Sequence, residues 1–153
     1  MLLGIGIQNL GTVDGEEVMF SAGDAFATAI QQSGTVKASK SAKILSDGGV
    51  VEVSGEITAH NEAGQGGRIE VGGTDLGADS APVASQTTIA KTAVLDASSD
   101  SGEGGHIVAY SGGHTQFDGL ADASSNAGQG GHIEVSGKTF SYDSSYPKSP
   151  RIK

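Results

Sequence analysis

Apolar and polar residues alternate in four segments of the chain, and each segment begins with a pair of glycines. The segments are Gly48–Gly55, Gly66–Gly73, Gly104–Ser111 and Gly130–Gly137. A period of two residues is typical of a β-strand, whose successive side chains point to opposite faces. The pattern predicts strands that bury Val51, Val53, Ile69, Val71, Ile107, Ala109, Ile133 and Val135. It predicts outward-facing side chains for Glu52, Arg68, Glu70, His106, His132 and Glu134.

A second, shorter pattern lies near these segments: an apolar or small residue, a variable residue and then alanine. Its copies are Val36-Lys37-Ala38, Ile57-Thr58-Ala59, Leu95-Asp96-Ala97 and Ala121-Asp122-Ala123. A small polar turn follows each of the last three copies. Helix-compatible residues occur in the run 21–30, but that run is short and is interrupted by Gly23. We therefore expect an all-β chain.

The spacing of the repeated segments indicates how the strands are arranged. Their first glycines lie 18, 38 and 26 residues apart. Such intervals are typical of solenoids, in which each coil stacks about 4.8 Å from the previous one. We interpret the chain as a parallel β-helix (β-solenoid) with coils of roughly 18–26 residues, two of them in the longest gap. An antiparallel sandwich is the competing arrangement, but the hairpin signal Asn-Gly is missing and the same strand and turn recur with one polarity.

Composition narrows the set of partners. The chain has 9 basic and 18 acidic residues, a net charge of -9 and no cysteine. Nucleic acid is therefore not expected as a partner, because phosphate binding needs a basic face. A disulfide framework and a thiolate metal site are excluded because the chain has no cysteine. The apolar start 1–7 has no basic region before it, so we do not interpret it as a signal peptide.

Two carboxylates are the candidates for catalysis. Asp96 and Asp122 occupy equivalent places in the second pattern, and a pair of carboxylates at suitable spacing can cleave a glycosidic bond. The same place also holds Lys37 and Thr58, so it does not require a carboxylate. We interpret it as a solvent-facing position and assign no catalytic residue.

Histidines and loop carboxylates are the candidates for metal binding. His106 and His132 occupy equivalent positions, and stacked imidazoles can bind a metal ion. Arg68 fills the same position in another repeat, which favours an exposed polar position, while His60 and His114 lie elsewhere. Calcium would have to use loop residues, because no calcium-binding nonapeptide or EF-hand loop occurs; these are Asp75, Asp79 and Asp100. We predict no metal site and no cofactor.

Several phrases of the chain resemble a known family. They are Gly48–Gly55, Val94-Leu95-Asp96-Ala97-Ser98, the run Gly128–Lys138, and Ile107–Ser111 followed by Thr115–Gly119. In order and co-occurrence they resemble the repetitive region of filamentous-haemagglutinin-like exoproteins, the large adhesins of two-partner secretion. The resemblance extends over 48–139 and, more loosely, over the coil around 18–24.

The resemblance implies a right-handed β-helix, export through a partner transporter in an outer membrane, and adhesion at the bacterial cell surface. It implies a host or cell-surface receptor or glycan as the binding partner. The secretion domain of such proteins is not recognised in the chain, so we expect a shaft fragment with one domain at 1–143 and a disordered tail at 144–153. Open ends of such a fragment predict end-to-end self-association. The alternative is a β-helical polysaccharide-processing enzyme, a lyase or glycoside hydrolase.

Overall fold

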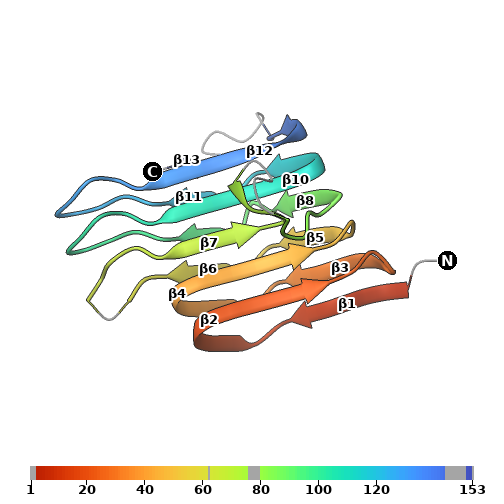
Figure 1. Ribbon diagram of the computed structural model, residues 1–153, viewed down its shortest axis with the longest axis horizontal. Coiled ribbons are helices and arrows are strands. Elements are labelled where there is room, and N and C mark those ends of the chain that lie inside the picture. The colour runs from red at the N-terminus through yellow and green to blue at the C-terminus, as the bar shows by residue number, and fades with distance from the viewer. Residues whose placement is uncertain (1–2, 62, 76–79, 144–150, 153) are drawn as a thin grey trace.

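The computed structural model describes residues 3–61, 63–75, 80–143 and 151–152. These residues form one β-sheet that curls round on itself (Figure 1), and the side chains inside the curl form an apolar core. Among them, no helix is long and apolar enough to cross a membrane. The strands are β1 (Leu3–Asn9), β2 (Thr12–Ala22), β3 (Phe26–Gln32), β4 (Thr35–Ser46), β5 (Val50–Val53), β6 (Glu56–Ala59), β7 (Arg68–Val71), β8 (Gln86–Ile89), β9 (Val94–Asp96), β10 (His106–Phe117), β11 (Leu120–Asp122), β12 (His132–Ser141) and β13 (Arg151–Ile152).

The strands pair in parallel and form three stacks that run side by side. The first stack contains β1, β3, β5, β8 and the second halves of β10 and β12. The second contains the first halves of β2 and β4, then β6, β9, β11 and β13. The third contains the second halves of β2 and β4, then β7 and the first halves of β10 and β12. The chain visits the three stacks in turn, so each pass lies on the previous one.

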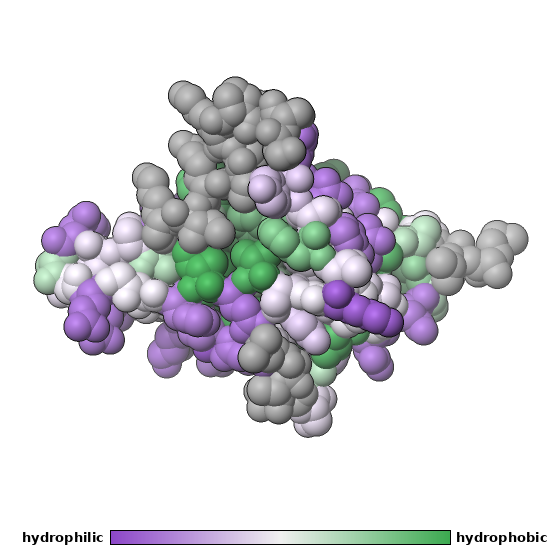
Figure 2. Space-filling view, turned by 90° about the horizontal axis from the view of Figure 1, so that it is seen from above, coloured by the Kyte–Doolittle hydropathy of each residue, from purple (hydrophilic) through white to green (hydrophobic). Residues whose placement is uncertain are grey.

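The interior is built from columns of apolar side chains contributed by all three stacks. In the third stack Val18, Ala42, Ile69, Ile107 and Ile133 follow one another in register. The first four are buried and Ile133 is partly buried, because its strand β12 is the last of this stack. The predicted register of Ile69, Ile107 and Ile133 is therefore confirmed, and the predicted burial is confirmed for Ile69 and Ile107 but is only partial for Ile133. Figure 2 looks along the stacks onto one end of the molecule and shows apolar residues near the middle of that end face.

The alanine pattern marks the second stack, as its recurrence predicts. Val36, Ile57, Leu95 and Ala121 form one buried column, and the alanines two residues later in each copy are buried beside it. In the last three copies the alanine ends its strand or directly follows it, at the corner before the polar loop. Small side chains keep neighbouring passes at strand spacing.

The predicted alignment of the glycine-led segments is wrong for one of them. Strand β5, which begins after Gly48-Gly49, pairs with β3 and β8 in the first stack and not with β7. Glycine pairs precede strands of the first stack and also strands of the third stack, so similar sequence segments occupy different stacks. The interval between the first two glycine pairs is consequently not a coil.

The predicted coil length needs the same correction. Ile69 of β7 is the register partner of Ile107 in β10, so the longest interval between glycine pairs is a single pass and not two. That pass exceeds the predicted range because the chain between β7 and β8 contains an insertion. The pass from Ile107 to its register partner Ile133 is within the range. The predicted tail lies mostly outside the described residues; within it, Arg151–Ile152 pair with β11.

Candidate functional site

Three similar loops connect the second stack to the third. In each, the second glycine of a pair donates its N–H to the carbonyl of the preceding alanine: Gly67 to Ala59, Gly105 to Ala97 and Gly131 to Ala123, at 2.6, 2.7 and 2.7 Å. These hydrogen bonds close the loops at their base. Beyond these hydrogen bonds the loops extend away from the sheet and lie one above another (Figure 1).

Small polar side chains join one loop to the next. The N–H of Asp100 donates to the carbonyl of Gly64 at 2.8 Å, and Asn126 Nδ2 donates to Asp100 Oδ1 at 2.9 Å. Ser125 bonds the N–H of Gly128 within its own loop and the carbonyl of Gly102 in the previous one. The polar turns of the sequence are therefore explained by contacts between passes, since loops without apolar cores need such hydrogen bonds to remain ordered.

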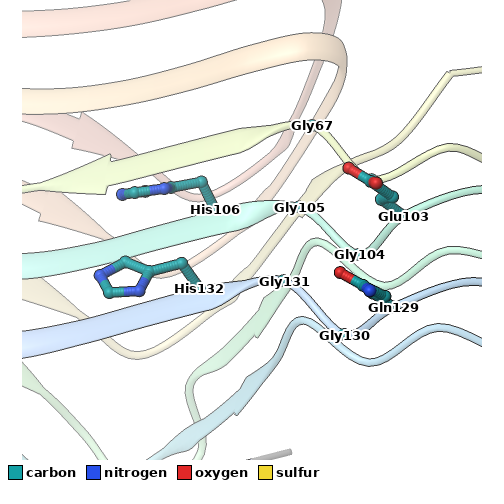
Figure 3. A pocket seen from close by; sticks show the side chains of 10 residues that line it. Gly67, Glu103, Gly104, Gly105, His106, Gln129, Gly130, Gly131 and His132 are labelled. Atoms are coloured by element: carbon teal, nitrogen blue, oxygen red, sulfur yellow. The ribbon is translucent and has the colours of Figure 1, made fainter.

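A polar groove of about 450 Å³ lies at the base of these loops. Its floor consists of the stacked glycine pairs, and four longer side chains line it: Glu103, Gln129, His106 and His132. Figure 3 shows the two imidazoles on the strand side of the glycines and the carboxylate and amide on the loop side. The groove combines hydrogen-bond donors, acceptors and metal-binding nitrogens on an open surface.

The outer column beside the groove contains Arg68, His106 and His132 in register, as predicted. The prediction for Glu70 is wrong in one respect. Its side chain points to the outer surface with that of Arg68, yet only 2% of it is accessible. The segment after β7 turns back across this surface, since Asp75 contacts both Arg68 and His106. The turn starts at Gly72, whose φ of 80° favours glycine.

Arg68 links two carboxylates. Its Nε donates to Glu70 Oε1 at 2.7 Å, and its terminal nitrogen donates to Asp75 Oδ2 at 2.8 Å. Burial disfavours the guanidinium charge, but the hydrogen bonds to Asp75 and Glu70 outweigh this and raise the pKa of Arg68. The other oxygen of Glu70 has Lys43 Nζ at 3.4 Å and makes no hydrogen bond. Arg68 is therefore the main partner of the buried carboxylate.

Asp75 connects this ion network to the histidines. Its Oδ1 lies 2.6 Å from His106 Nε2. Partial burial raises the pKa of the Asp75 carboxyl, whereas hydrogen bonds from Arg68 and His106 lower it more, so the net pKa is lowered. The ring of His106 in turn lies against that of His132, with centroids 4.8 Å apart and an angle of 39° between planes. The sequence did not predict this cluster, because Asp75 and His106 are far apart along the chain.

We expect the Arg68→Met variant to lose about 2–3 kcal/mol of unfolding free energy, because it leaves Glu70 buried with only a distant lysine. Urea titration followed by circular dichroism measures the loss. Lys43→Met is the matched control and should cost less than about 1 kcal/mol, since Lys43 is 40% exposed and lacks hydrogen-bond geometry. Equal losses in both variants would contradict the role given to Arg68.

The carboxylates considered for catalysis do stack. Asp96 and Asp122 are register partners in the second stack. Each accepts a hydrogen bond from a backbone N–H two residues later, Ser98 at 2.9 Å and Ser124 at 2.9 Å. This Asx-type contact stabilises the start of the polar loops. Both carboxylates therefore have a structural role at the corner where the second stack leads into the polar loops.

The other candidates are dispersed. Asp75 belongs to the Arg68 and His106 cluster, Asp100 lies in a loop with Asn126, and Asp79 lies outside the described residues. His114 lies on the first stack, where its ring nitrogens contact Thr139 and Ser141 at 2.8 Å each. In the described ranges, no group of three or more His, Asp or Glu side chains is arranged to hold a metal ion.

No protein-family model and no curated protein matches the sequence. The function is therefore inferred from the stacks, the loops and the groove, together with the phrases of the sequence that resemble secreted adhesins.

Proposed function

We propose that the chain is a stretch of right-handed parallel β-helix that serves as a shaft segment of a secreted bacterial surface adhesin. The observation that carries the proposal is the continuous parallel register of the three strand stacks. A shaft needs such repetition, because each pass contacts only its neighbours and length can be added without changing the core. The proposed location at the cell surface and the proposed role in adhesion rest on the resemblance of the sequence to secreted adhesins.

Two further features of the chain support this proposal. Polar side chains are spread along the outer columns, as in the ladder from Gln8 to Gln31, whose side chains are hydrogen-bonded at 2.5 Å. The absence of cysteine suits a chain that crosses an outer membrane unfolded through a partner transporter. The binding partner of the proposed adhesin is a host or cell-surface receptor or glycan. Self-association of open strand edges is a further expected contact.

The enzyme alternative is less well supported. A polysaccharide-processing β-helix needs free carboxylates that converge on a cleft. Asp96 and Asp122 accept hydrogen bonds from their own turns, and neither lines the groove at the glycine corner. Turnover of a polysaccharide that disappears in Asp96→Asn would favour the enzyme instead.

Surface labelling tests the proposal. Antibodies raised against the folded 153-residue chain should label intact cells of the producing organism and reduce their attachment to a host-cell layer. Deletion of the gene for the outer-membrane partner transporter should abolish the labelling. A matched deletion of an unrelated outer-membrane protein controls for damage to the envelope. Labelling that requires permeabilised cells would contradict a surface location.

A further inference from the structure

We propose that His106 and His132 form a binding site for one divalent transition-metal ion, with Cu²⁺ preferred over Zn²⁺. The site goes beyond the shaft role, because a shaft needs no metal. Its two protein ligands come from adjacent strands, and solvent in the groove completes the coordination.

The strand register places the two imidazoles at suitable separation. His106 of β10 and His132 of β12 are direct register partners, and their ring centroids are 4.8 Å apart. Two imidazoles in adjacent positions around one metal, at about 2.05 Å per nitrogen, have centroids about 4.5 Å apart at the 90° angle that Cu²⁺ prefers and about 5 Å apart at the tetrahedral angle. The observed centroid separation of 4.8 Å lies between these two values.

Asp75 orients one of the ligands. A carboxylate accepts hydrogen bonds at neutral pH, so the 2.6 Å contact makes His106 Nε2 the donor. The neutral ring then carries its lone pair on Nδ1, the nitrogen left for a metal. A carboxylate bound to the second ring nitrogen is the usual companion of a metal-binding histidine, because it fixes the tautomer and increases basicity. Arg68 holds Asp75 in turn, at 2.8 Å.

The groove supplies access and further oxygen donors. His132 is exposed, and both imidazoles border the open groove with Glu103 and Gln129 on the opposite wall (Figure 3). A metal held by two imidazoles therefore retains positions for water. Nitrogen donors favour Cu²⁺ over Zn²⁺ in the general order of stability for divalent ions, whereas Ca²⁺ and Mg²⁺ prefer oxygen ligands.

Calorimetric titration of the folded 153-residue chain with CuCl₂ at neutral pH tests the site, and electron paramagnetic resonance identifies the ligands. One ion per chain is expected, with nitrogen coupling from two imidazoles. His106→Gln and His132→Gln should each weaken binding at least about 10-fold, and Asp75→Asn about 10-fold through the orientation of His106. Zn²⁺ should bind more weakly and Ca²⁺ should not compete.

His114→Gln is the control, since His114 is a histidine of the first stack away from this groove. It should bind Cu²⁺ as tightly as the unmodified chain. Circular dichroism of every variant establishes that the fold is retained before titration. Unchanged binding in the double variant His106→Gln/His132→Gln would overturn the proposal, because it would assign the ion to the amino terminus or another site. Equal loss in His114→Gln would overturn it as well.

Discussion

Replacing Ile107 with aspartate is expected to lower the free energy of unfolding by about 4 kcal/mol or more. Ile107 is fully buried in the interior column, between Ile69 of the previous pass and Ile133 of the next. An aspartate there has no cationic partner and leaves a gap in the packing. Since domains of this size are stable by about 5–15 kcal/mol, this loss is a large share of the total and should move the midpoint of unfolding to a much lower urea concentration. Far-ultraviolet circular dichroism during a urea titration measures the change.

Thr58→Asp is the matched control, because it adds the same charge at an outer position. Thr58 lies in register between Lys37 and Asp96, so the position already has a carboxylate on one neighbour and a lysine on the other. We expect a change within about 0.5 kcal/mol. A similar loss in both variants would show that the inward and outward assignment of the strands is wrong.

The sequence was sufficient to predict the parts of the fold that repeat locally. Period-two alternation places Ile69 and Ile107 inside, and the recurrence of the alanine pattern places Ile57 over Leu95. Both depend on short-range spacing, which strand geometry fixes. The sequence also separates the polar loops from the strands, because serine, asparagine and glycine clusters favour turns.

The rest of the fold depends on contacts between passes that spacing does not encode. The corner loops and the insertion after β7 give the passes different lengths, so no single period aligns the strands. The same insertion buries Glu70, which the alternation alone places in solvent. The approach of Asp75 to His106 follows from this insertion, and so does the cluster from which the metal site is proposed. An Arg and a Glu two residues apart on one outer face were the available signal for an ion pair.

Gly105, at the corner before β10, is expected to be important for stability because the backbone of neighbouring segments lies close to it. A Cβ on Gly105 would meet the carbonyl oxygen of Gly67 at 2.2 Å and that of Ala97 at 2.9 Å. These two oxygens accept the hydrogen bonds from His106 at 2.8 Å and from Gly105 at 2.7 Å, which join adjacent passes and close the loop. A methyl group must therefore displace backbone atoms and cannot be accommodated by a rotamer change.

Gly105→Ala should consequently lower the free energy of unfolding by about 3 kcal/mol, the upper range for overpacking. Gly130 of the last glycine pair is the control, since a Cβ there has only the carbonyl of Ala123, at 4.0 Å. Gly130→Ala should be neutral or should stabilise by up to about 1 kcal/mol, because alanine restricts the unfolded chain. Urea titrations of both variants measure the difference. If Gly105→Ala proves as stable as Gly130→Ala, the corners are not held by close backbone contact, and the glycine pairs require another explanation.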